Sequence, residues 1–136
     1  MGRYNLHMPR KLAKASMPVL RSHCPVCAGL EFVGDRWTLL IVRDMLFFGK
    51  RRYGEFADAP ESIPTNILAE RLKKLQRYGL VTVAAYQDNP PRYEYQLTAA
   101  GLALRPILEA IAQWSLAHVP VAGHVTSSGN CNSLPA

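Results

Sequence analysis

A change of hydrophobic period at Gly79 constrains the fold of this 136-residue chain more than any other feature of its sequence. Before the glycine stand leucines with helical spacing, at Leu68, Leu72 and Leu75. This i, i+4, i+7 spacing predicts a helix with one buried face within residues 62–78. After the glycine, residues 80–86 are rich in β-forming side chains, and residues 92–98 alternate apolar with polar positions. Because the turn signal QDNPP separates these two runs, we expect a β-hairpin directly after the helix.

The segment before this helix predicts a second, shorter helix close to it. Tyr53 and Phe56 are three residues apart, which is enough for a short helix that Pro60 closes. Ser62 or Thr65 can cap the longer helix, and the glycine after it suits a left-handed C-terminal residue. Two short helices joined this tightly are a helix-turn-helix pattern, and a hairpin that follows them is a wing.

Two helices are predicted upstream of the helix-turn-helix. Pro25 can open the first, because its missing N–H would be unpaired there anyway, and Gly34 ends it. Asp35 can cap a helix over residues 36–48, which Gly49 stops.

A last helix is predicted from Thr98 as its cap to about residue 119, with a bend at Arg105 and Pro106. It is apolar on more than one side, which favours burial against a second copy of the chain, although some of these side chains can instead belong to the intramolecular core. The residues expected at the dimer contact are Leu102, Ile107, Leu108, Ile111 and Trp114.

These elements predict one α+β, mainly α-helical domain. It is a winged helix-turn-helix domain with a two-stranded β-hairpin wing and a long C-terminal dimerisation helix. We place it at residues 24–119, between a flexible basic N-terminal tail, 1–23, and a flexible C-terminal tail, 120–136.

The charge of the chain favours an anionic partner. The formal net charge is +6, and residues 1–23 contain five basic side chains and no acid. A basic tail attracts nucleic acid or an acidic surface, although many such tails only increase solubility. The most apolar run, residues 37–48, is interrupted by Arg43 and Asp44, and the N-terminus lacks the apolar core of a signal peptide. We therefore expect a cytoplasmic protein that does not bind membranes.

The polar face of the helix before Gly79 is the candidate DNA-reading surface. Asn can pair with adenine and Lys can donate to guanine, whereas a solvated face is the alternative interpretation. The candidates on this helix are Pro64, Thr65, Asn66, Ala69, Glu70, Lys73, Lys74 and Arg77. The predicted phosphate contacts are Lys50, Arg51 and Arg52 before the helix-turn-helix and Arg92 at the wing. Arg71 lies nearer the apolar side and can brace the fold by pairing with an acid.

The three cysteines, Cys24, Cys27 and Cys131, are too few and odd in number for a disulfide framework. Cys24 stands at a predicted helix start, where the helix dipole lowers a thiol pKa and favours the reactive thiolate; a packed, inert thiol is the alternative. Zinc bound by Cys24 and Cys27 would need two further ligands, and a disulfide between them would be strained within a helix. We predict no metal and no cofactor.

No catalytic constellation is visible in the sequence. The four histidines are scattered, and there is no phosphate-binding loop, no Gly-x-Ser-x-Gly and no His-Glu-x-x-His motif. The chain is therefore predicted not to be an enzyme.

Taken in order, several motifs resemble the HxlR family of bacterial winged-helix transcription regulators, relatives of the MarR group. The resemblance covers residues 24–119. Its motifs are CP at 24–25, GDRWTLLIVRDML at 34–46, RRYGEF at 51–56, IPTNILAERLKKLQRYGLV at 63–81 and PPRYEYQLTAAG at 90–101.

The resemblance implies a homodimer that binds double-stranded DNA at a palindromic operator and regulates nearby genes. Some members of the family use the cysteine at the position of Cys24 to sense electrophiles or oxidants. Cys27 departs from the family pattern, and Asp88 at the wing tip weakens the attraction of the wing for phosphate. The rival hypothesis is a winged-helix protein-interaction module without sequence-specific DNA reading, which acids on the recognition face would favour.

Overall fold

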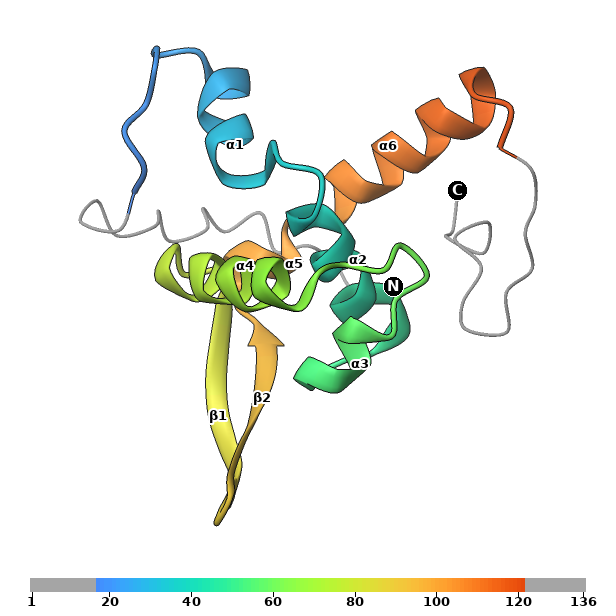
Figure 1. Cartoon of the computed structure of the whole chain (residues 1–136). Coiled ribbons are helices and arrows are strands. Elements are labelled where there is room, and N and C mark those ends of the chain that lie inside the picture. Colours follow the sequence, from blue (N-terminus) through green and yellow to red (C-terminus); the bar gives the residue numbers. More distant parts are fainter. Residues whose placement is uncertain (1–16, 122–136) are drawn as a thin grey trace.

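Helices and one two-stranded antiparallel sheet make up residues 17–121, the part of the chain that the computed structural model describes (Figure 1). The elements are α1 (Pro25–Val33), α2 (Thr38–Phe48), α3 (Tyr53–Ala57), α4 (Thr65–Arg77), β1 (Val81–Asp88), β2 (Pro91–Leu97), α5 (Ala99–Leu102) and α6 (Arg105–His118). This order confirms the predicted mainly α-helical winged helix-turn-helix fold with a hairpin wing.

The helix-turn-helix consists of α3 and α4. The phenol of Tyr53 in α3 donates a hydrogen bond to the carbonyl oxygen of Thr65, the first residue of α4, at 2.8 Å. The predicted caps of α4 were wrong, because neither Ser62 nor Thr65 holds that position: Pro64 does, and no side chain caps the helix. The predicted left-handed residue at its end is confirmed by Gly79, whose φ is 75°.

The wing is longer than the sequence predicted. β1 and β2 pair from Val81 opposite Leu97 to Asp88 opposite Pro91, with an irregularity between Ala85 and Gln87. The expected five-residue turn is therefore wrong in extent, since only residues 89–90 lie outside the strands. Pro91 is compatible with this pairing because it is the first residue of its strand. In Figure 1 the two strands extend well below α4.

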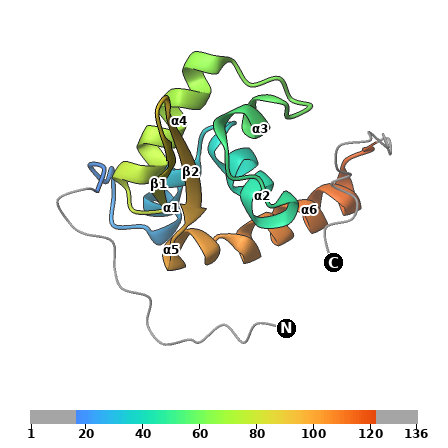
Figure 2. The same ribbon diagram turned by 90° about the horizontal axis from the view of Figure 1, so that it is seen from below.

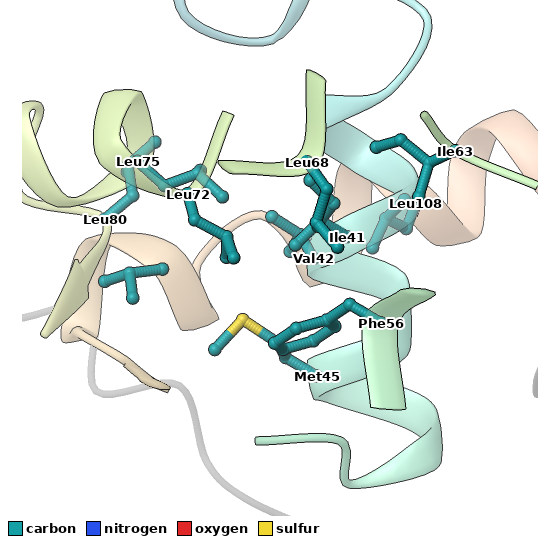
Figure 3. Close-up of a cluster of buried hydrophobic side chains, with 11 residues drawn as sticks. Ile41, Val42, Met45, Phe56, Ile63, Leu68, Leu72, Leu75, Leu80 and Leu108 are labelled. Atoms are coloured by element: carbon teal, nitrogen blue, oxygen red, sulfur yellow. The ribbon is translucent and has the colours of Figure 1, made fainter. Parts of the chain in front are cut away.

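The core forms where α4 packs over α2 and α3 (Figure 3). Leu68, Leu72 and Leu75 are each at most 1% exposed, which confirms the predicted buried face of α4. They join Ile41, Val42 and Met45 of α2 and Phe56 of α3. Each such side chain contributes roughly 1.5–3 kcal/mol on burial, so this contact is sufficient to fix how α4 lies on the fold.

The last helix is divided, as the expected bend at Arg105 and Pro106 implied. α5 ends at Leu102, and α6 begins at Arg105 with the proline in its first turn, where a missing N–H costs no hydrogen bond. Thr98 accepts a hydrogen bond from the N–H of Gly101, which confirms it as the cap. Figure 2 shows α6 along the side of the molecule opposite α4.

The predictions for the two tails fall mostly outside the described residues, which include only 17–23 and 120–121 of those segments. Within residues 17–121, no helix is both long and apolar enough to cross a membrane.

Asp35 joins two helices, α2 and α4, at one carboxylate. It accepts hydrogen bonds from the N–H groups of Trp37 and Thr38 at the start of α2, both at 3.1 Å, and so satisfies them as predicted, although Trp37 holds the N-cap position itself. It also binds Arg71 of α4 at 2.8 Å, so the predicted bracing role of that arginine is confirmed. Burial alone would raise the pKa of Asp35, but the hydrogen bonds from Thr38 and Arg71 outweigh it and hold the pKa well below its usual range.

We predict that Asp35→Asn lowers the free energy of unfolding by about 1–2 kcal/mol at pH 7, the usual effect of losing a cap. A depressed carboxyl pKa contributes stability that is fully present above the unfolded-state pKa of about 4 and is lost as the pH falls toward the folded-state value. The difference between wild type and variant should therefore narrow in urea unfolding at pH 3.

Asp88→Asn on the exposed wing is the matched control and should leave stability unchanged at both pH values. A stability loss in Asp35→Asn that is equally large at pH 7 and pH 3 would contradict an electrostatic role for Asp35.

Candidate nucleic-acid interface

The outer face of α4 is accessible to solvent along its whole length. Its inner leucines are buried, whereas a polar side chain is exposed on nearly every outward turn of the helix. The exposed residues of α4 are Thr65, Asn66, Glu70, Lys73, Gln76 and Arg77. These residue types supply both hydrogen-bond donors and acceptors to a partner.

The N-terminus of α4 is well suited to an anion. No side chain caps the helix, so the N–H groups of its first turn stay open to a partner beside exposed Pro64 and Thr65. A helix N-terminus of this kind binds phosphate through its free N–H groups and the positive end of the helix dipole.

Two predicted DNA contacts face the fold instead. Lys74 is only 17% exposed, and its ammonium nitrogen lies 3.5 Å from a carboxylate oxygen of Asp35. Lys50 is 15% exposed and lies 3.3 Å from Asp44. Both lysines are already paired with acids of the fold, which makes them structural cations here. Ala69 is half-buried.

The arginines around the wing fall into two groups. Arg52 binds Glu94 of β2 at 3.1 Å, and its guanidinium carbon lies 4.1 Å from the ring centre of Tyr86, so it is tied to the wing. Arg51 and Arg92 are exposed, and neither makes an ion pair within residues 17–121. Arg51 and Arg92 therefore keep their charges available to an anionic partner.

Cys24 is the exposed N-terminal cap residue of α1, as predicted. Hydrogen bonds from the backbone N–H groups of Cys27 and Val26 lower the pKa of its thiol. Arg21, close to Cys24 in sequence, pairs with Glu31. Cys27 is half-buried and also a free thiol, while the prediction for Cys131 falls outside the described residues.

The outward side of α6 exposes a large apolar surface. Ile107, Ile111 and Trp114 lie one turn apart, and Trp114 is 61% exposed. Together with Pro106 and Ala110 they line a shallow hollow of about 460 Å3. Exposed apolar patches of this kind on a small domain are typical of protein–protein contacts.

For one residue of the predicted dimer contact, the structure supports the alternative of burial in the intramolecular core. Leu108 is 8% exposed and packs in the core of its own chain, because it points from α6 toward the buried side chains of α2. The other four residues of the predicted set are exposed: Leu102, Ile107, Ile111 and Trp114.

Comparison with known protein families identifies the family of the chain. The family model for HxlR-like helix-turn-helix proteins matches residues 32–122, which contain α2 to α6 and the wing. The chain belongs to the HxlR-like helix-turn-helix family. The resemblance predicted from the sequence is thereby confirmed, and relatives in this family carry names of transcription regulators.

The HTH-type transcriptional regulator Rv3095 of Mycobacterium tuberculosis is 43% identical over 91 residues, which cover 67% of this chain and 56% of that protein. The chain thus spans little more than half the length of this relative. Among solved structures, the oxidized form of the redox regulator HypR has a TM-score of 0.64 and 32% identity over 72% of this chain and 100% of that one. The reduced transcriptional regulator YodB of Bacillus subtilis has a TM-score of 0.59 and 28% identity, covering 73% and 97%.

In this HxlR-family chain, a buried ion-pair cluster escaped the sequence analysis. Arg43 of α2 binds Asp44 at 2.7 Å and Glu61 at 2.5 Å, and Glu61 stands just before the segment that leads into α4. Burial alone would lower the pKa of Arg43, but the hydrogen bonds that its guanidinium donates to Glu61 and Asp44 raise it instead. The cluster therefore anchors the chain that enters the recognition helix. The sequence contains a signal for this cluster, because Arg43 and Asp44 are adjacent opposite charges inside an apolar run, and such a pair indicates a buried ion pair.

No group of three or more His, Cys, Asp or Glu side chains within residues 17–121 could hold a metal ion.

Proposed function

We propose that this chain is a dimeric, sequence-specific DNA-binding regulator of transcription that reads a palindromic operator. The observation that carries the proposal is the exposed, polar outer face of α4, with an uncapped N-terminus, beside a projecting wing. Family membership supports the regulatory role. Because the proposed target is DNA, the proposed place of action is the bacterial cytoplasm.

Base reading is assigned to the N-terminal half of α4. Asn66 is exposed there and has the amide geometry to pair with the major-groove edge of adenine. Lys73 lies two turns farther along the same face, and Thr65 stands beside the helix N-terminus. Phosphate contacts fall to Arg51 and Arg92, whose charges are available, with Arg92 reaching the minor groove from the wing.

The rival interaction module receives no support from the charge of this face. Its only acid, Glu70, lies 2.8 Å from Arg71 of the same helix, so its charge is already balanced. Exposed Lys73 and Arg77 leave the rest of the face basic.

Dimerisation is assigned to the apolar side of α6. A second copy of the chain can cover Ile107, Ile111 and Trp114 with its own equivalents, since a two-fold axis brings the same patch of both copies together. Two recognition helices related by that axis would read two equivalent half-sites, which is why the operator should be palindromic.

A thiol switch at Cys24 is the proposed control. The thiol is exposed and its pKa is lowered, and the similar structures HypR and YodB include a redox regulator in its oxidized form and a transcriptional regulator in its reduced form. Helix α1 contacts the end of α4, because the rings of Phe32 and Tyr78 meet edge-on with centres 5.1 Å apart. Modification of Cys24 can therefore act on α4 through α1.

For DNA reading, we predict that Asn66→Ala lowers affinity for promoter DNA flanking the gene by roughly 5- to 150-fold, since one good bidentate base contact is worth about 1–3 kcal/mol. Affinity for random DNA should stay nearly unchanged. Fluorescence anisotropy with both duplexes measures the two affinities.

The matched pair Lys73→Ala and Lys74→Ala tests the orientation of α4 in the same assay. Lys73→Ala removes an exposed charge and should lower both DNA affinity and the salt dependence of binding. Lys74→Ala removes an inward-facing lysine and should leave DNA affinity unchanged. An Asn66→Ala variant that weakens both duplexes equally would mean that Asn66 does not read a base.

For assembly, we predict that Ile111→Glu converts a dimer into a monomer in light scattering at micromolar concentration. A carboxylate would then have to be buried against the apolar patch of the second copy, and that burial is unfavourable without a partner charge. Gln113→Glu, on an exposed neighbouring position of α6, should remain dimeric. A wild-type monomer in this measurement would defeat both the dimer and the palindromic operator.

For regulation, we predict that oxidant lowers the DNA affinity of wild type by about 5- to 150-fold, the usual range for coupling between two sites. Cys24→Ser should stay bound to the same DNA under oxidant. Cys27→Ser and Cys131→Ser should be measured in the same assay, because the thiol of either residue can form the resolving disulfide with Cys24. If Cys24→Ser responds to oxidant as wild type does, Cys24 is an inert thiol.

A further inference from the structure

A groove lies between α3 and the wing, both of which lie below α4 in Figure 1, and of its lining residues only Arg92 has a part in the proposed reading of DNA. Its volume is about 820 Å3, within the ~300–1,000 Å3 range of small-molecule sites. Four of the six tyrosines of the chain line it: Tyr53, Tyr86, Tyr93 and Tyr95. Such a concentration of aromatic rings around one hollow points to a ligand.

The tyrosines present flat, partly fixed walls. Tyr95 rests edge-on against buried Phe56, with ring centres 6.2 Å apart, and Tyr86 is covered on one side by Arg52. Aromatic walls favour a flat aromatic ligand, which can stack on the rings or meet them edge-on, over a saturated one of equal size. Phenol groups along the rim can donate hydrogen bonds to polar groups at the edge of that ligand.

The charges around the groove cancel. Arg52 and Arg92 line it, and so do Glu55 and Asp58. These are two positive and two negative side chains, and the carboxylate of Glu55 also accepts the backbone N–H of Arg52 at 3.1 Å. A groove without net charge disfavours phosphate and favours a ligand that carries no charge itself.

Through its walls, the groove is linked to the DNA-reading elements. The phenol of Tyr53, which lines the groove, donates a hydrogen bond at 2.8 Å to the carbonyl oxygen of Thr65, the first residue of α4. The N–H of Tyr95 in the wing donates to the carbonyl oxygen of Arg51 at 2.8 Å. A molecule in the groove would therefore touch the supports of both the recognition helix and the wing.

We propose that this groove binds a flat, uncharged aromatic molecule with hydrogen-bonding groups on its rim, and that its occupancy changes DNA affinity. The second half rests on the proposed function, whereas the first half stands without it.

Binding is tested on the full chain without DNA, by calorimetric titration with 2-naphthol. Two probes of similar size are compared with it: 2-naphthoate, which carries a negative charge, and 2-decalol, which is saturated. We expect saturable binding of 2-naphthol at least fivefold tighter than that of either comparison probe. Absence of saturable binding, or equal binding of all three, overturns the proposed site.

Variants locate the bound probe. Tyr86→Leu and Tyr93→Leu should each weaken the binding of 2-naphthol at least tenfold. Because Tyr93 is half-exposed on the wing, Tyr93→Leu remains usable if Tyr86→Leu fails to fold. Tyr78→Leu removes a tyrosine outside the groove and should change nothing. Equal losses in all three variants overturn the assignment to this groove.

The regulatory half is tested by repeating the anisotropy measurement with saturating 2-naphthol. DNA affinity of wild type should change at least fivefold, and Tyr93→Leu, which should no longer hold the probe, should lose this response. Unchanged DNA affinity in wild type overturns this half. If the chain binds 2-naphthol but no DNA, the proposed function fails and the groove site stands.

Discussion

One carboxylate, that of Asp35, ties the proposed DNA-reading helix to the rest of the fold. It caps the start of α2 and binds both Arg71 and Lys74 of α4, so two helices meet at a single charged group. Its strongly depressed pKa keeps it ionised at any pH near neutrality. Because the inner face of α4 is occupied by buried leucines and by these ion pairs, only its outer face remains for a partner.

The cations of the domain divide into two classes that composition cannot separate. One class is paired with acids inside the fold and consists of Arg43, Lys50, Arg71 and Lys74. Removing one partner of such a pair would leave an uncompensated buried charge. Exposed lysine and arginine side chains on α4, on the loop before α3 and on the wing remain available. The positive charge offered to a partner is therefore set by where these side chains point and not by the net charge alone.

Local signals in the sequence predicted most of the fold. The buried face of α4, the left-handed Gly79 and the divided last helix were all correct, because each depends on neighbours within one or two turns of the chain. The order of motifs gave the family. The cap of α4 was wrong, since Pro64 holds a position that sequence preference gives to Ser or Thr.

The orientation of individual side chains in the site was harder to predict. Lys73 and Lys74 are neighbours with the same chemistry, and only the distant Asp35 decides that the second one turns inward. Likewise Leu108 is buried and Ile107 is exposed because of how α6 restarts after its break and packs on α2. The groove between α3 and the wing is assembled from segments more than 25 residues apart, so no local pattern announces it.

The central claim is that two copies of α4 read two half-sites of one operator, and hydroxyl-radical footprinting of promoter DNA flanking the gene tests it most directly. The account predicts two protected patches related by two-fold symmetry, with centres about 10–10.5 base pairs apart or a multiple of that distance. Protection that is uniform along the fragment, or absent at protein concentrations that saturate random DNA, would contradict it.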